Sequence, residues 1–185
     1  GGNGGGGGGR HHGFGFGTKK ATTTRATHDA SQRLMAELEH ISSSDPEKQG
    51  YSVEPIDDNL YHWEIKLFNF EDTEPLAKDL KKRKDQHILL HIKFPPQYPL
   101  SPPFIRVIRP RFQYRTGHVT IGGSICYQLL TQSGWSPANT VEAVIVSLRA
   151  NLLLGGARLD PSSRRDYTEA EAKAAFDRMV RDHGW

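Results

Sequence analysis

Five prolines within nine residues constrain this chain more than any other feature. Residues 95–103 read PPQYPLSPP. Proline fixes its own φ, lacks the amide hydrogen that a helix or a central strand needs, and keeps the preceding residue out of the helical region. The segment therefore predicts a rigid, extended loop that separates the regular elements before it from those after it.

The spacing of apolar residues predicts the elements on both sides of this loop. Helical spacing indicates an amphipathic helix over residues 30–41, opening near Asp29, and a helix that begins at Asn139 or Thr140 and ends at Gly155. A capping box of Thr168 and Glu171 opens a last helix through about Asp182. Alternation or short apolar runs predict strands, at residues 51–56, from 61 to 67, at 88–94 and at 104–108. The charged residues 78–85 are interpreted as a solvated hairpin.

This order of elements predicts the fold class. Strands in one run with helices at the ends are typical of an α+β domain. We expect a four-stranded antiparallel meander, an N-terminal helix and C-terminal helices.

Glycine and charge divide the chain into two parts. Eleven of the 19 glycines lie in residues 1–17, which lack apolar periodicity. We therefore expect residues 1–28 to be a disordered glycine-rich linker and residues 29–185 to be one folded domain. Such a linker suggests a further domain upstream, in a longer chain. Four basic residues and one acidic residue in residues 1–30 account for the whole net charge of +3. The domain itself is neutral, so we expect no nucleic-acid partner.

Several classes of function lack their signatures. The single cysteine excludes an intramolecular disulfide and a cysteine-rich zinc site, and no phosphate-binding loop, dinucleotide fingerprint or nucleophile elbow occurs. No apolar run approaches the length of a membrane span or has the pattern of a signal peptide. We expect no metal and no membrane partner, and a cytoplasmic or nuclear protein.

Cys126 is the remaining candidate for chemistry. A lone cysteine is usually a small buried hydrophobe, but this one follows Gly122-Gly123-Ser124-Ile125 in a predicted loop. Glycines allow other backbone to approach closely. A thiolate attacks acyl groups and also leaves them well, so the setting favours acyl transfer.

Three motifs in order resemble the catalytic domain of ubiquitin-conjugating enzymes. They are Tyr98-Pro99-x-x-Pro102-Pro103, Gly123-Ser124-Ile125-Cys126 and Trp135-Ser136-Pro137-Ala138. The stretches Ile88-Leu89-Leu90, Gly156-Ala157-Arg158 and Gly184-Trp185 resemble the divergent Q-type branch. The resemblance covers residues 30–185 and implies the ubiquitin-conjugating fold. It also implies an enzyme whose Cys126 receives ubiquitin from an activating enzyme as a thioester and transfers it to a substrate protein. The acceptor would be lysine, with Ser or Thr hydroxyls as a further possibility in this branch. ATP would be used upstream, so this chain needs no cofactor.

The resemblance also implies accessory residues near Cys126. Thr116-Gly117-His118 stands where most of the family has His-Pro-Asn, so His118 could donate a hydrogen bond or act as a base. A loop histidine facing solvent is the alternative. Gln128 replaces a common acidic residue. His183 and Trp185 would line the acceptor side, unless they form an ordinary helix end.

Binding residues follow from the same resemblance. Pro137 and Ala138 would meet a ubiquitin ligase, with Ile108 in the other half of that surface. Arg33 would meet the activating enzyme and the ligase, or be a solvated helix charge. The competing hypothesis is a catalytically silent module on the same fold that binds ubiquitin or a ligase.

Overall fold

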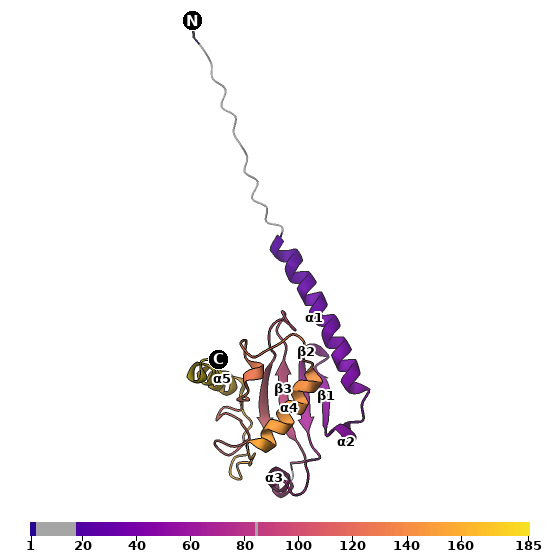
Figure 1. Ribbon diagram of the computed structural model, residues 1–185, viewed down its shortest axis with the longest axis vertical. Coiled ribbons are helices and arrows are strands. Elements are labelled where there is room, and N and C mark those ends of the chain that lie inside the picture. Colours follow the sequence, from indigo (N-terminus) through magenta and orange to yellow (C-terminus); the bar gives the residue numbers. More distant parts are fainter. Residues whose placement is uncertain (3–17, 84) are drawn as a thin grey trace.

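The computed structural model describes residues 1–2, 18–83 and 85–185, and it describes the side chains of the long first helix from residue 28 onward (Figure 1). The elements follow in the order α1 Thr18–Ser42, α2 Pro46–Gln49, β1 Tyr51–Ile56, β2 Asn59–Leu67, α3 Pro75–Arg83, β3 Ile88–Lys93, β4 Phe104–Arg109, a 3-10 turn η1 Gln128–Leu130, α4 Val141–Leu154 and α5 Glu169–His183.

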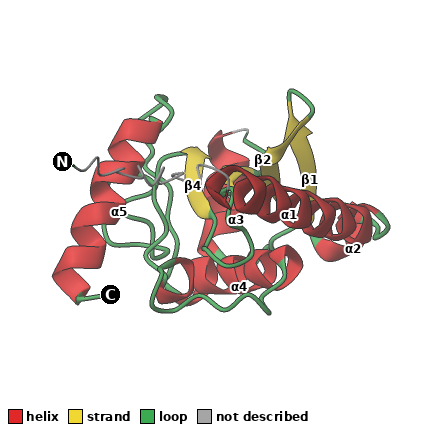
Figure 2. Cartoon of the chain, turned by 90° about the horizontal axis from the view of Figure 1, so that it is seen from above, coloured by secondary structure: helices red, strands yellow, loops and turns green. Residues whose placement is uncertain are grey.

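The four strands form one antiparallel sheet in the order β1-β2-β3-β4, which confirms the predicted α+β meander. Alternate residues of the strands, among them Trp63, Ile65, Leu90, Ile92 and Val107, are buried on one face. The predicted stripe of α4 is buried in the same core, through Val141, Val144, Ile145, Leu148 and Leu152. Figure 2 shows α4 along this face and α5 beyond β4, at the end of the molecule away from β1.

Two predictions about local structure were wrong. Residues 75–83 form the helix α3 instead of part of a solvated hairpin. Pro75 occupies the first turn, where its missing N–H costs nothing, and Leu76 and Leu80, four residues apart, are buried. The three cations Lys81, Lys82 and Arg83 suit the carboxyl end of this helix dipole. Because the helix is short and ends in three cations, its apolar face was not evident in the sequence.

The first helix begins earlier than the sequence predicted. The backbone is helical from Thr18, so Asp29 lies inside α1 and does not cap it. The expected disordered tail over residues 1–28 is therefore wrong for residues 18–28. Its glycine-rich part, residues 3–17, lies outside the described residues. Among the described side chains of α1, from residue 28 onward, Ala30, Leu34 and Ile41 are buried.

A buried carboxylate joins α1 to two other parts of the domain. Glu37 is only 7% exposed. It accepts hydrogen bonds from the Arg33 guanidinium at 2.5 Å, from the Tyr98 hydroxyl at 2.8 Å and from the backbone N–H of Val141. Tyr98 belongs to the proline loop, and Val141 opens α4. An anion at a helix N-terminus is favoured by the exposed amides and the helix dipole.

Replacing Glu37 by alanine should destabilise the fold by about 2–4 kcal/mol, because the Tyr98 hydroxyl and the Val141 amide would be buried without partners. Urea unfolding followed by circular dichroism measures this loss. Glu39→Ala, at an exposed position of the same helix, is the matched control and should change stability by less than about 0.5 kcal/mol. Equal effects of the two substitutions would refute a structural role for the carboxylate.

Candidate active site

Cys126 lies at the end of a tightly hydrogen-bonded loop. Its backbone N–H donates to the carbonyl of His118 at 2.7 Å, and Val119 pairs with Ile125 in an isolated antiparallel bridge. Thr120 N–H donates to the Ser124 carbonyl at 2.9 Å, which closes the turn between them. The loop therefore fixes Cys126 directly opposite His118. It also uses the Cys126 amide, which is then unavailable as an oxyanion donor.

The two glycines before the cysteine allow α5 to approach this loop. A Cβ atom on Gly122 would lie 2.3 Å from the carbonyl oxygen of Glu171. A Cβ on Gly123, whose φ is +89°, would lie 2.5 Å from the ring of Tyr167. Both contacts are shorter than packed atoms tolerate, so a side chain at Gly122 would push α5 away and one at Gly123 would displace Tyr167. The sequence prediction of close backbone approach is confirmed at Gly122, whereas the neighbour of Gly123 is a side chain.

This approach creates a cavity of about 490 Å³ beside Cys126. One wall is the loop from Tyr114 to Ile121, which includes His118, and the floor includes Gly155 at the end of α4. The opposite wall is α5, through Ala175, Arg178, Met179, Asp182 and His183. Cys126, His118 and His183 are thus brought to one cavity from segments that are far apart in the sequence.

His118 adopts a left-handed backbone conformation, with φ of +54°. Gly117, also left-handed, donates its N–H to the Gly155 carbonyl at 2.8 Å, which anchors the turn on the end of α4. A Cβ on Gly155 would lie 2.7 Å from the imidazole Cδ2. The ring is exposed, and no hydrogen bond holds it within the described part of the chain. It is therefore free to turn toward a ligand at the thiol.

His183 is held more firmly. Its Nδ1 lies 2.9 Å from the carbonyl oxygen of Met179, and its ring contacts that of Trp185 with centroids 4.5 Å apart. Because a carbonyl only accepts, Nδ1 must carry the hydrogen, and Nε2 of the neutral ring keeps its lone pair. His183 can therefore accept a proton in the cavity. Trp185 itself lines a different cavity of about 470 Å³, between the proline loop and α5.

The thiol is half-buried, and burial raises the pKa of Cys126 above its ordinary value. Desolvation disfavours the charged thiolate, and no opposing cation lowers the pKa again. The resting group is therefore a thiol at neutral pH. It becomes a strong nucleophile only when its proton is removed.

Other predicted site residues lie outside this cavity. The side chain of Gln128 is exposed at the start of η1 and does not line the cavity. Arg33 is not a free helix charge, because it pairs with Glu37 and donates to the Asn139 carbonyl at 3.1 Å. Ile108 is only 6% exposed, so its predicted place on a binding surface is wrong. As a strand residue beside Tyr167, it belongs to the packing of β4.

An exposed apolar residue that the sequence patterns did not predict lies in the proline loop. Leu100 in the proline loop is 68% exposed. The loop joins the segment that precedes Pro137, because the Trp135 indole N–H donates to the Pro99 carbonyl at 2.7 Å. Leu100 could have been singled out, since a leucine among prolines in a loop has little chance of reaching a core.

Within the described residues, no group of three or more His, Cys, Asp or Glu side chains is arranged to hold a metal ion. The helices described there also include none with the length and apolar character of a membrane span.

Residues 33–183 match the family model described as "Ubiquitin-conjugating enzyme". The chain is 35% identical over 161 residues to the ubiquitin-conjugating enzyme E2 Q-like protein CG4502 of Drosophila melanogaster, covering 84% of this chain and 52% of that protein. It is 40% identical over 140 residues to the human ubiquitin-conjugating enzyme E2 Q-like protein 1, covering 72% of this chain and 86% of that protein. The chain thus spans about half the length of the fly relative.

Solved structures bear out the predicted fold. Human ubiquitin-conjugating enzyme E2 G1 superposes with a TM-score of 0.53 at 28% identity, over 66% of this chain and 93% of that one. A ubiquitin-conjugating enzyme E2 from Plasmodium falciparum gives a TM-score of 0.53 at 22% identity, over 67% and 84%. The similarity confirms the ubiquitin-conjugating fold, and the names of the relatives confirm the predicted Q-type branch.

The raised pKa of Cys126 predicts the pH dependence of its alkylation. Its labelling by iodoacetamide should rise with pH and reach its midpoint at a higher pH than that of a free cysteine peptide. Mass spectrometry of the intact chain gives the rate at each pH, and a cysteine peptide is the control. A midpoint below that of the peptide would show that the site stabilises the thiolate instead.

Proposed function

The chain belongs to the ubiquitin-conjugating enzyme family, and we propose that Cys126 carries ubiquitin as a thioester and passes it to a protein acceptor. One observation carries the proposal: the only cysteine of the chain is half-buried at a cavity with two imidazoles on its walls. A purely structural cysteine would be enclosed in the core. The cavity leaves room beside the sulfur for an acyl group and an attacking nucleophile.

In the charging step, the Cys126 thiolate attacks the thioester carbonyl by which an activating enzyme holds the ubiquitin carboxyl terminus. A new C–S bond forms at Sγ, and the thiolate of the activating enzyme leaves. The Cys126 thiol first loses its proton to a base or to solvent, which gives the attacking thiolate. ATP is consumed by the activating enzyme, so this chain needs neither a nucleotide nor a metal.

In the transfer step, a lysine amine or a Ser or Thr hydroxyl attacks the same carbonyl. His183 Nε2 accepts the proton of the attacking group, because its Nδ1 is held by Met179. The Cys126 thiolate leaves and is then protonated. His118 turns its ring toward the developing oxyanion and donates a hydrogen bond there. Such a donor is required because the Cys126 amide is already bonded to the His118 carbonyl.

Exposed residues of the proline loop and of the segment after Trp135 form the proposed partner surface. Leu100, Pro137 and Ala138 offer a small apolar patch to a ubiquitin ligase. The Arg33 guanidinium pairs with Glu37 but keeps part of its surface exposed, and this part contributes to docking of the activating enzyme or ligase. Because the match covers only 52% of the fly relative, these partners and substrates are proposed for the whole protein, acting in the cytoplasm or nucleus.

The proposed thioester can be tested by charging the chain with ubiquitin. With activating enzyme, ATP and ubiquitin, the chain should gain one ubiquitin in a bond that dithiothreitol cleaves, as read on a non-reducing gel. Cys126→Ser should give either no product or an ester that resists dithiothreitol. If the folded chain is never charged by an activating enzyme that charges another conjugating enzyme, the silent binding module becomes the better explanation. Binding of ubiquitin or a ligase would then be measured.

A substitution of His183 separates a role in base catalysis from a role in folding. His183→Ala should leave charging unchanged and slow discharge to a serine peptide by about 100-fold, the lower range of a lost general base. Discharge to hydroxylamine, which needs no base, should be unaffected. His87→Ala, outside the cavity, is the control. Equal slowing with serine and hydroxylamine would show that His183 acts only through structure.

A further inference from the structure

Five arginines surround a small cavity of about 200 Å³ at one end of the domain. They are Arg83, Arg109, Arg111, Arg164 and Arg165, and the acidic residues that line the cavity with them are Asp85 and Asp166. Arg83 pairs with Asp85, and Arg109 pairs with Asp166. The lining therefore keeps an excess of positive charge within a domain that is neutral as a whole.

Two of these arginines form a rigid base for the cavity. Arg83 donates to the backbone carbonyls of Asp160 and Ser163, at 2.5 and 2.9 Å. Arg111 donates to the carbonyls of Arg165 and Asp166, both at 3.0 Å, and its guanidinium lies over the Tyr167 ring. Both side chains are largely buried by these contacts. They hold the segment 160–166 in place.

The other three arginines form an accessible rim. The side chains of Arg109 and Arg165 are 52% and 73% exposed, and each makes only one contact with a carboxylate, to Asp166 and Glu171 respectively. Arg164 is exposed, and its side chain has no hydrogen bond or ion pair with any described residue. Guanidinium donors with unused capacity at a concave site are suited to carboxylate or phosphate oxygens.

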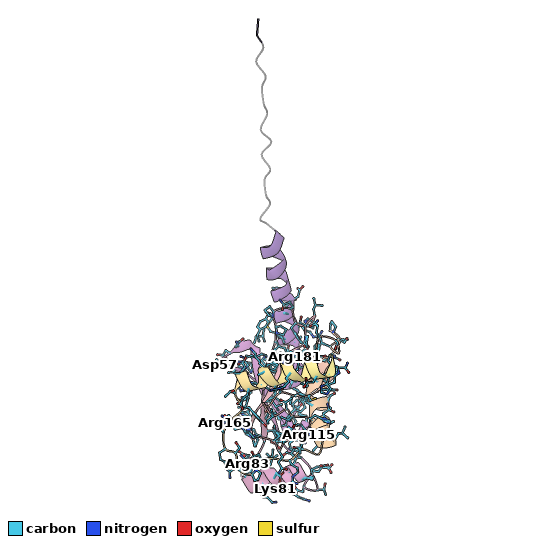
Figure 3. All side chains as sticks on the ribbon, turned by 90° about the vertical axis from the view of Figure 1, so that its left-hand side faces the viewer. Asp57, Lys81, Arg83, Arg115, Arg165 and Arg181 are labelled. Carbon is cyan, nitrogen blue, oxygen red and sulfur yellow. The ribbon has the colours of Figure 1, made fainter. Side chains whose placement is uncertain are left out.

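A row of cavities joins this arginine pocket to Cys126. A middle cavity of about 370 Å³ shares Arg111 with the arginine pocket. It shares Tyr114, Val119, Thr120 and Ile121 with the cavity of Cys126. Tyr114 and Ile121 are exposed apolar side chains between the two ends, at 69% and 67%. In Figure 3, Arg165, which lines the arginine pocket, and Arg115, which lines the Cys126 cavity, are labelled below α5 on opposite sides of the view.

We propose that the acceptor polypeptide lies along this row and places an acidic or phosphorylated side chain in the arginine pocket. This inference rests on the proposed function, because it assigns the substrate class of the same site. The apolar side chains of Tyr114 and Ile121 support the segment between the acceptor residue and the anion. A nucleic acid fits less well, because the excess positive charge is confined to one small cavity of a domain that is otherwise neutral, whereas a nucleic acid carries repeated phosphates.

The geometry limits the spacing between acceptor and anion. The middle cavity shares Arg111 with the arginine pocket and Tyr114 with the Cys126 cavity, and these two residues are three positions apart, so their Cα atoms are separated by at most about 11 Å. We allow a similar length for the Cys126 cavity, whose volume of about 490 Å³ is comparable with the 370 Å³ of the middle cavity. At about 3.3 Å per residue, an extended substrate needs on the order of four to eight residues between its acceptor and its acidic side chain.

The test uses the full chain and fluorescein-labelled peptides with one acceptor. A serine or lysine acceptor is placed six residues from phosphoserine, glutamate or alanine. Transfer from the ubiquitin-charged enzyme gives KM and kcat for each peptide, and fluorescence anisotropy with the uncharged chain gives binding directly. Arg164→Glu/Arg165→Glu is the test variant. Lys48→Glu/Lys78→Glu makes the same change in net charge at exposed residues outside the row.

We expect the phosphoserine and glutamate peptides to have a KM about 10-fold lower than the alanine peptide, with similar kcat. The preference should disappear in Arg164→Glu/Arg165→Glu, remain in the control variant, and weaken as salt increases. Both variants should still be charged with ubiquitin.

Three results would overturn the inference. They are equal KM values for all peptides in the unmodified chain, a preference that survives in Arg164→Glu/Arg165→Glu, or tighter binding of a single-stranded oligonucleotide of matched charge. Failure of the proposed function is a separate outcome. A chain that is not charged but binds the phosphoserine peptide through Arg164 and Arg165 would refute thioester chemistry while upholding the pocket.

Discussion

The carboxylate of Glu37 is the interaction on which the arrangement of the helices depends. It is one of few charged side chains buried in the described structure, and it contacts α1, the proline loop and the first amide of α4. These are the parts whose relative positions the sheet alone does not determine. Fixing the start of α4 also fixes its end, because a helix of 14 residues is a rigid rod about 21 Å long. Gly155 at that end anchors the turn that carries His118.

Tyr167 holds the opposite wall of the site. Its N–H donates to the Ile108 carbonyl, its hydroxyl accepts from the Phe112 amide, and its carbonyl accepts from Arg106. These bonds fix the residue just before α5 against β4 and against the loop toward Cys126. The ring also occupies the space that Gly123 leaves open. The active-site cavity is thus built from two rigid supports, α4 and Tyr167, rather than from the flexibility of the loop between them.

Sequence patterns predicted the features that depend on local rules. The strands, the Thr168–Glu171 capping box and the stripe of α4 follow from periodicity and capping alone, and the structure confirms them. Cys126 was singled out by its loop and glycines. The cavity could not be predicted from such local patterns, because His183 and the turn at His118 meet only through tertiary packing; their place near Cys126 was expected from the family resemblance alone. Helix α3 was missed because its buried face is short, and Ile108 was misassigned because an apolar strand residue beside a loop can face either the core or solvent.

The properties of the thiol explain why such an elaborate site is needed. Burial raises the pKa of Cys126, and a thiol of high pKa is a poorer leaving group, although its thiolate is a better nucleophile. In the proposed mechanism, charging of Cys126 with ubiquitin is therefore favoured once the thiol has lost its proton. Transfer of ubiquitin from Cys126 needs the help of groups on the acceptor side. That help must come from a base, an oxyanion donor and a well-placed acceptor. In the proposed mechanism, the imidazoles of His183 and His118 supply the first two. The middle cavity and the arginine pocket, outside the reacting centre, are proposed to supply the third.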